Sequence, residues 1–251
     1  MIEVVQQGSV AVMTMRHGKA NAMDIAFCNR ITACFEQFAA SSARAAVLTG
    51  QGRMFSAGVD LIRAMESGPD YFPIFLPALR RALEAVFFCD KPVVAAINGH
   101  AIAGGCILAC AADHRLMVRE GGRIGVTELQ VGVPFPVIAL EIMRFAAAPH
   151  RLEQLVFGAA TYEAEAALEL GLVHEAVDGA AVVDRAIAVA QSRAALAPAA
   201  FALSKRQTRQ MVANRLAIDG PRFDLAVDRV WLSADAKTRM RDYVTRTFKK
   251  A

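Results

Sequence analysis

Short apolar runs of strand length alternate with helical patterns over the first two thirds of the chain. The runs that predict strands lie at residues 10–15, 46–49, 92–97, 115–118 and 172–177. Helical patterns separate them, including one over 104–112 and one that Asn21 is expected to cap at its N-terminus. No strict repeat is present. Strands that alternate with helices favour an α/β fold with parallel pairing.

The last part of the chain, from about residue 179, has a helical pattern throughout. Helices are expected at 180–195, 198–212 and 223–248, with a break near Ser233 in the last of them. We therefore predict a core over residues 1–190 and a helical assembly region over 191–251. Its basic end, 239–250, fits either a solvated helix terminus or a contact for the phosphates of a ligand.

Composition adds a constraint, since 55% of the 251 residues are hydrophobic and 21% are charged. Such a chain needs a large core, a subunit interface or a membrane to bury its apolar surface. The longest apolar run, 101–112, is shorter than the roughly 20 residues of a spanning helix, and Gly104-Gly105 interrupts it. The N-terminus carries no basic segment typical of a signal peptide, so a cytoplasmic location is expected.

Charge and cysteine content exclude several other classes. The net charge of +4 does not indicate nucleic-acid binding, but it suits a small ligand that bears phosphate. The five cysteines are odd in number and form no CxxC pair, which indicates reduced thiols. Cys106 and Cys110 would share a helix face without a further ligand at suitable spacing, so no metal site is expected.

Two segments carry backbone amides that chemistry could use. At 54–61, small residues at a turn precede a helix start, which leaves N–H groups unpaired; the plainer alternative is an ordinary turn with Asp60 as N-cap. At 97–109, a strand runs into Gly104-Gly105 at the start of an apolar helix. Donors from two such segments could form an oxyanion hole. His100 is more typical of a packed or capping histidine than of a catalyst.

A third segment, 123–136, contains a candidate acid/base. Glu128 lies in an otherwise apolar stretch. There its carboxylate would be desolvated and its pKa raised, which suits proton transfer. The alternative is a surface glutamate on an irregular loop.

Together with Lys19-Ala20-Asn21-Ala22-Met23, these segments resemble in order and spacing the enoyl-CoA hydratase/isomerase (crotonase) family. The resemblance covers essentially the whole chain. It implies a crotonase-like α/β spiral of ββα units with a helical C-terminal trimerisation region, often assembled as a dimer of trimers. It also implies an acyl-CoA thioester as substrate, with no other cofactor. Ligand spacing, net charge and run length already argue against a metal, nucleic acid and a membrane span.

Matched positions within that resemblance give the expected site. The N–H groups of Val59 and Gly104 would hold the thioester oxygen, and Glu128 would move the proton. The residues expected to border the CoA moiety are Lys19, Ala20, Ala57, Gly58, Asp60, Leu61, Tyr243 and Arg246. Phe135 and the stretch 65–79 are candidates for the acyl pocket, although 65–79 could equally pack against the C-terminal helices.

One departure from the family pattern narrows the chemistry. Hydratases of this family use two glutamates, and Ile107 stands where the first would be. The remaining pattern is similar to the single-glutamate Δ3,Δ2-enoyl-CoA isomerases, because shifting a double bond requires only one group to remove and return a proton. An enoyl-CoA hydratase, another crotonase-type reaction and a non-catalytic CoA-ester-binding protein remain as alternatives.

Overall fold

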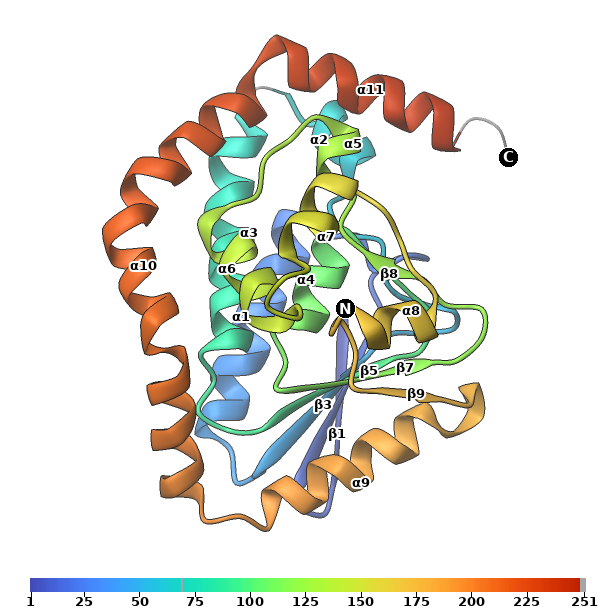
Figure 1. Ribbon diagram of the computed structural model, residues 1–251, viewed down its shortest axis with the longest axis vertical. Coiled ribbons are helices and arrows are strands. Elements are labelled where there is room, and N and C mark those ends of the chain that lie inside the picture. Colours follow the sequence, from blue (N-terminus) through green and yellow to red (C-terminus); the bar gives the residue numbers. More distant parts are fainter. Residues whose placement is uncertain (69, 249–251) are drawn as a thin grey trace.

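The computed structural model describes residues 1–68 and 70–248 (Figure 1). Its main sheet has six strands in the order β1-β2-β3-β5-β7-β9. All neighbours pair in parallel except the β1–β2 hairpin. The strands are β1 (Ile2–Gln7), β2 (Val10–Met15), β3 (Ala45–Thr49), β5 (Val93–Ile97), β7 (His114–Val118) and β9 (Glu175–Val177).

A smaller parallel sheet has three strands in the order β4-β6-β8. They are β4 (Met54–Ser56), β6 (His100–Ile102) and β8 (Ile124–Gly125). Each follows a strand of the main sheet along the chain, so that strand pairs and helices recur as the spiral that was predicted.

Helices cover both faces of the main sheet. They are α1 (Ile25–Ala40), α2 (Leu61–Glu66), α3 (Tyr71–Phe87), α4 (Gly104–Cys110), α5 (Glu128–Val131), α6 (Val137–Ala146), α7 (Leu152–Gly158), α8 (Ala164–Glu169), α9 (Val182–Ala194), α10 (Pro198–Leu232) and α11 (Ala234–Phe248), with a 3₁₀ turn at Gly179–Ala181. Helix α9 packs against β3 and β5, while α1 and α3 pack against each other. Figure 1 shows α9 beneath the sheet and α1 and α3 above it.

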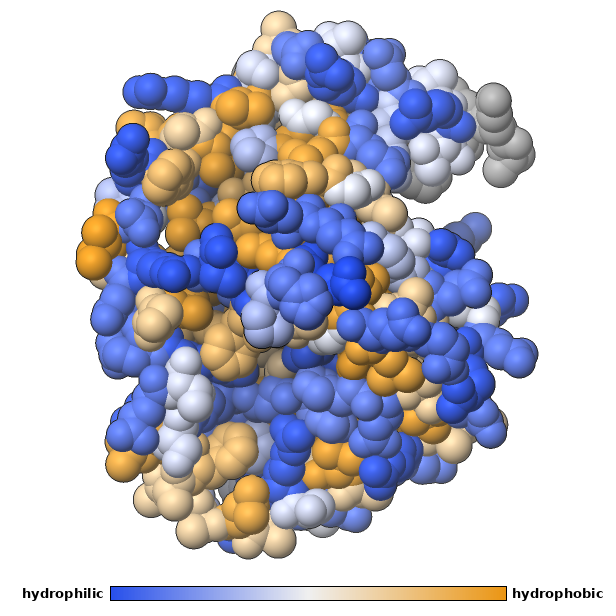
Figure 2. Space-filling model, viewed as in Figure 1, coloured by the Kyte–Doolittle hydropathy of each residue, from blue (hydrophilic) through white to orange (hydrophobic). Residues whose placement is uncertain are grey.

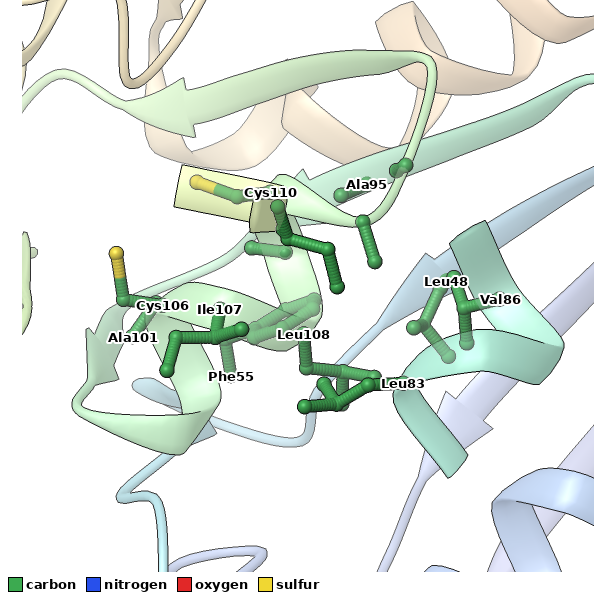
Figure 3. Packing of buried hydrophobic residues seen from close by; sticks show 14 of the residues in the cluster. Leu48, Phe55, Leu83, Val86, Ala95, Ala101, Cys106, Ile107, Leu108 and Cys110 are labelled. Atoms are coloured by element: carbon green, nitrogen blue, oxygen red, sulfur yellow. The ribbon is translucent and has the colours of Figure 1, made fainter. Parts of the chain in front are cut away.

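Helix α4 lies at the centre of the core, and all seven of its residues are buried. Figure 3 shows its side chains in one apolar cluster with Leu48 of β3, Ala95 of β5 and Leu83 of α3. Packing from several directions therefore fixes the N-terminus of α4. This N-terminus lies within the segment 97–109, the second of the two segments with unpaired backbone amides.

The C-terminal region differs from the sequence prediction in one respect. Helix α10 is continuous over 35 residues and passes through Pro221, where two shorter helices were expected. The chain beyond the proline is tied to α3, because Asp224 and Asp228 both pair with Arg80. These contacts hold the helix although Pro221 donates no backbone hydrogen bond. The break at Ser233 is confirmed.

The boundary predicted at residue 190 falls inside α9. The last turn of α9 still packs on the core, since Ala190 and Ala194 are buried. The chain leaves the sheet only at Pro198, where α10 begins and runs along one side of the molecule (Figure 1).

Apolar surface gathers where α10 passes α6 and α7, in the upper left of Figure 2. It includes the exposed side chains of Phe157, Ile218 and Phe223. A cavity of about 1060 Å³ between α6, α7 and α10 is part of this surface. The predicted excess of apolar residues is therefore divided between a buried core and an exposed apolar face.

No single helix within residues 1–68 and 70–248 is long and apolar enough to cross a membrane. The helical stretches Gly179–Ala194 and Pro198–Leu232 meet the length and composition test only when joined across a bend of 104°.

Candidate active site

A largely apolar cavity of about 660 Å³ brings together most of the residues singled out from the sequence. The described residues that line it include Lys19, Ala20, Ala57, Val59, Asp60, Leu61, Gly104, Ile107, Glu128 and Tyr243. Its wall comes from the turn after β4, the start of α4, helix α5, and parts of α3, α6, α10 and α11. Segments more than 200 residues apart in sequence thus share one chamber.

Backbone pairing between the Lys19–Met23 motif and the turn after β4 fixes that turn. The Ala57 N–H donates to the Ala20 carbonyl, and Met23 bonds to Gly58 O at 2.7 Å and to Asp60 N at 3.0 Å. These bonds flank Val59 on the side of Met23. The N–H of Val59 therefore points away from Met23, as alternation along an extended chain requires.

The turn and the start of α4 approach each other closely. Gly58 has φ +80°, and a Cβ there would lie 2.7 Å from Ile102 O and 2.9 Å from Gly104 N. Glycine is needed at this position both for its backbone angle and for the space. A Cβ on Gly104 would lie 3.8 Å from the Val59 nitrogen. The two backbone nitrogens are thus neighbours across the two segments.

The backbone N–H groups of Val59 and Gly104 donate to no acceptor in the part of the chain that the structure describes. Gly104 is the first residue of α4, where helical N–H groups are unpaired. It follows Ala103, whose φ of +51° turns the chain sharply into the helix. Two free donors at one wall of a cavity have the chemistry of an oxyanion hole.

Glu128 begins helix α5 and is 8% exposed. Burial raises its pKa to about 7, although the backbone N–H groups of Thr127 and Glu128 partly oppose that rise. Its Oε2 atom has no hydrogen-bond partner among residues 1–68 and 70–248. The side chain is therefore a desolvated carboxyl that is able to gain or lose a proton near neutral pH.

The inner part of the cavity is apolar. Ile107 on α4 is 3% exposed and contributes to its lining. Leu79 and Leu83 of α3, Ala139 of α6 and Trp231 of α10 also line the cavity. Within the stretch 65–79, Leu79 lines the cavity, while Phe72 packs edge-on against Trp231 of α10 at 5.5 Å.

The rim of the cavity is polar and cationic. Asp24 caps α1 through the Phe27 N–H, and its carboxylate also receives Arg63 at 2.7 Å and His17 at 3.0 Å. These bonds help to hold its pKa below the usual range, against the opposing effect of burial. Arg63, His17 and the exposed Lys19 thus place basic groups beside the cavity entrance.

Asn21 is not the cap that was expected, because Asp24 takes that place. Asn21 adopts φ +47° and is buried. Its amide donates to Phe55 O at 3.0 Å and accepts from His17 N at 2.7 Å. The residue fixes the segment that leads into Ala22 and Met23, and so supports the turn at Val59.

Three residues that were expected to contact the substrate do not line this cavity. Phe135 does not line this cavity but the one between α6, α7 and α10, because in the extended stretch before α6 Val133 and Pro136 face the candidate site. Gly58 is buried behind the lining and acts through its backbone. Arg246 lies beside the ring of Tyr243 at 5.9 Å without lining the cavity, where Thr247 stands instead.

Some lining residues had no signal in the sequence. Trp231 is the single tryptophan of the sequence and lies near the end of a long helix, so its position depends on α10 returning to the core. There its indole N–H donates to Pro134 O at 3.0 Å. Arg63 lies one turn into α2, and only the fold brings it to Asp24. No group of three or more potential metal ligands occurs in the described chain.

Comparison with known proteins identifies the class. The family model for enoyl-CoA hydratase/isomerase matches residues 5–235. The carnitinyl-CoA dehydratase of Escherichia coli K12 is 33% identical over 208 residues, which are 81% of this chain and 78% of that protein. A putative enoyl-CoA hydratase of Thermus thermophilus is 36% identical over 165 residues, 64% of each chain.

Solved structures of enoyl-CoA hydratases and isomerases also superpose on this chain. A probable enoyl-CoA hydratase from Mycobacterium tuberculosis superposes with a TM-score of 0.83 at 30% identity, covering 91% of this chain and 97% of that one. Human mitochondrial Δ3-Δ2-enoyl-CoA isomerase gives a TM-score of 0.91 at 25% identity, covering 99% and 98%.

The paired sheets, the helical tail and these superpositions define a crotonase-fold protein. The chain belongs to the enoyl-CoA hydratase/isomerase family, whose members act on acyl-CoA thioesters. Both the hydratase and the isomerase names occur among its relatives, so the reaction has to be argued from the site.

Proposed function

We propose that this protein is a Δ3,Δ2-enoyl-CoA isomerase in which Glu128 is the single proton shuttle. The observation that carries the proposal is the pairing of a desolvated Glu128 with Ile107 in the inner cavity. Two other carboxylates among the described residues line the cavity, but Asp24 is held by Arg63 and His17, and Asp60 caps α2 through the Arg63 N–H. Neither is a free base.

The reaction follows from these positions. The thioester oxygen accepts hydrogen bonds from the N–H groups of Val59 and Gly104. The Glu128 carboxylate removes a proton from C2, and electrons move to the oxygen to give a dienolate. The same carboxyl then returns the proton to C4, which leaves the double bond between C2 and C3. No water is added, and the atoms balance without a cofactor.

Placement of the CoA moiety is part of the proposal. Arg63 and Lys19 provide positive charge at the rim, which suits the phosphates of CoA. Other residues expected to border the CoA also line the cavity, namely Ala20, Ala57, Asp60, Leu61 and Tyr243. The acyl chain would extend toward Leu83, Ala139 and Trp231, where the lining is apolar.

Hydration is the second candidate, because several relatives carry hydratase or dehydratase names. It requires a group that activates water opposite Glu128, and Ile107 has no atom able to do so. Assays with 3-enoyl-CoA and 2-enoyl-CoA distinguish the isomerase from the hydratase and from a non-catalytic binding protein. Conjugation of the 3-enoyl substrate that is lost in Glu128→Gln supports the isomerase. Robust hydration without isomerisation would refute it, and binding without turnover would indicate a CoA-ester-binding protein.

We also infer self-association, as a trimer or a dimer of trimers, from the apolar face along α10. Ile218 is 76% exposed and Met211 66% exposed on this helix, which is unusual for a free surface. Light scattering at increasing concentration tests the inference, and a monomer throughout would contradict it. A cytoplasmic location stays a prediction.

A further inference from the structure

A second cavity, of about 350 Å³, lies apart from the candidate active site. It is bounded by the start of β7, the ends of α6 and α9, and the first half of α10. The two cavities share no lining residue in the described chain. Its basic side chains are Arg115, Arg193, Lys205 and Arg209, and Asp113 is the one carboxylate among the described residues that line it.

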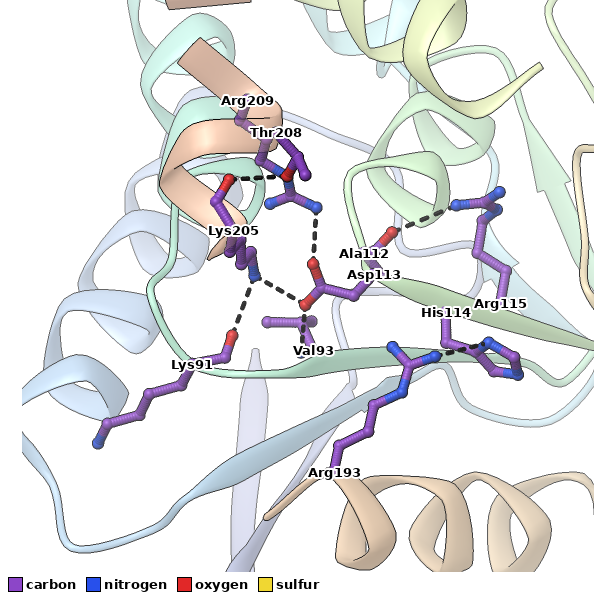
Figure 4. A network of polar contacts seen from close by, with 10 residues as sticks. All are labelled: Lys91, Val93, Ala112, Asp113, His114, Arg115, Arg193, Lys205, Thr208 and Arg209. Atoms are coloured by element: carbon purple, nitrogen blue, oxygen red, sulfur yellow. Dashed lines mark hydrogen bonds and ion pairs between the residues drawn. The ribbon is translucent and has the colours of Figure 1, made fainter. Parts of the chain in front are cut away.

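Asp113 is fully engaged by its neighbours (Figure 4). Lys205 Nζ and Arg209 Nη2 each donate to it at 2.7 Å, and the Val93 N–H donates at 2.8 Å. The Asp113 carboxylate thus forms ion pairs with two buried cations, Lys205 and Arg209.

The other cations have no acid of their own among the lining residues. The guanidinium of Arg115 donates to the backbone carbonyls of Leu172, Gly171 and Ala112. Carbonyl groups satisfy its hydrogen bonds but leave its charge uncompensated. Arg193 reaches the Nδ1 atom of His114 at 3.0 Å. The nearby carboxylate of Glu175 does not contact Arg193 directly, because it pairs with Arg185 and with the Nε2 atom of His114.

Arg209 is also incompletely satisfied. Its guanidinium lies 4.1 Å from the centre of the Phe87 ring, and its side chain is 4% exposed. The Nη1 atom is buried and has no hydrogen-bond partner within residues 1–68 and 70–248. A buried guanidinium nitrogen without an acceptor is costly, so the cluster favours an added acceptor.

Burial is the main influence on the ionisation of these cations, and their mutual repulsion is a smaller one. Burial lowers the pKa of Lys205, and Arg209 lowers it further while Asp113 opposes the fall. Burial likewise lowers the pKa of Arg193 and Arg209; Asp113 opposes the fall in both, and Arg115 adds to it. With four basic side chains and one carboxylate among the described lining residues, positive charge is in excess around the cavity.

Neutral donors complete the lining. His174 Nδ1 accepts the Arg115 N–H at 3.1 Å, so that its Nε2 atom carries the proton. Burial, aided by Arg115, lowers the pKa of His174 to about 3, which keeps the ring neutral. The Ser204 hydroxyl also lines the cavity, whereas the Thr208 hydroxyl beside it already donates to the Lys205 carbonyl at 2.9 Å.

We propose that this cavity binds a small oxyanion of the phosphate type, held by Arg193, Lys205 and Arg209 with hydroxyl and imidazole N–H donors around it. The volume is ample for one tetrahedral anion. A bound anion would offset the excess of positive charge and would link α9 and α10 to the start of β7.

The test is titration of the full-length protein with inorganic phosphate by calorimetry, at constant ionic strength set with chloride. The wild type should bind in a saturable manner. Arg193→Gln removes a half-buried donor and should weaken binding by about tenfold or more, as for a charge-assisted hydrogen bond. Ser204→Ala should weaken it less.

Arg206→Gln is the matched control, since it removes one positive charge from the exposed side of α10, where Arg206 pairs with Asp90. This variant should bind phosphate as the wild type does. Saturating CoA should leave phosphate binding unchanged, because the two cavities are separate. Absence of saturable binding, equal weakening by R193Q and R206Q, or displacement of phosphate by CoA would each overturn the proposal.

Discussion

Glu128 and Ile107 line the same inner cavity, one from the start of α5 and the other from the middle of α4. The carboxyl has an unpartnered Oε2 within the described chain, and the isoleucine beside the oxyanion donors cannot orient a water. In the proposed mechanism Glu128 is therefore the group that moves the proton, and the first predictions follow from this relationship.

The isomerase rate should depend on the ionisation of Glu128. Because burial raises its pKa to about 7, the base is protonated and inactive in acid. We expect kcat/KM for 3-enoyl-CoA to rise with pH, with a midpoint near pH 7, and then to level off. A rate profile measured from pH 5 to 9 checks this. A midpoint near pH 4.5 would show that the carboxyl is solvated.

Glu128→Gln should stabilise the fold while abolishing isomerisation. The native pKa is about 7 and the unfolded value is ordinary, so the native state binds more protons between these values. Ionisation of Glu128 therefore costs stability as pH rises through this window, up to about 3 kcal/mol above pH 7. Thermal unfolding should favour E128Q at pH 8 and show little difference at pH 4. An E128Q protein less stable than wild type at pH 8 would contradict the account.

Ile107→Glu should introduce some hydration of 2-enoyl-CoA. A second carboxylate would face the same chamber as Glu128 and could orient water, at a cost in stability because it is buried. Ile107→Gln has similar volume without the charge and is the control. Hydration that appears in both variants or in neither would show that the residue at position 107 does not select the reaction.

Gly58→Ala should disrupt the oxyanion donors. Its Cβ would meet backbone atoms at 2.7 Å and 2.9 Å, one of them the Gly104 nitrogen. We expect kcat to fall by about 10²–10³, as when an oxyanion donor is lost. Gly8→Ala is the control, since Gly8 has φ +60° with no atom near its Cβ position. Kinetics of both variants at matched folded fraction should show loss in G58A alone.

Elements with continuous apolar runs were predictable from the sequence, and β2, β3, β5 and β7 lie close to the expected ranges. The strands β4, β6 and β8 have three, three and two residues. They were missed because pairing between distant segments, rather than local pattern, creates them. The continuity of α10 through Pro221 was missed for the same reason, since Arg80 supplies the tie from another helix.

In the candidate site, too, some residues could be predicted from the sequence, whereas others depend on contacts between distant segments. Glu128 stood out because a lone carboxylate in an apolar stretch is unusual, and the structure buries it. Val59 and Gly104 were expected from the family resemblance, and they lie together through the pairing of Met23 with the turn. Phe135 was misplaced because spacing from Glu128 does not tell which face of an extended segment a side chain takes. Trp231 depends on the return of a long helix.

The central claim is that Glu128 alone carries the proton from C2 to C4. Deuterium transfer in a single turnover tests it most directly, with 3-enoyl-CoA labelled at C2 and mass analysis of the 2-enoyl product. A buried carboxyl with no bonded neighbour at Oε2 should deliver a measurable part of the label to C4, and E128Q should form no product. Complete loss of the label to solvent, or turnover in E128Q, would contradict the account.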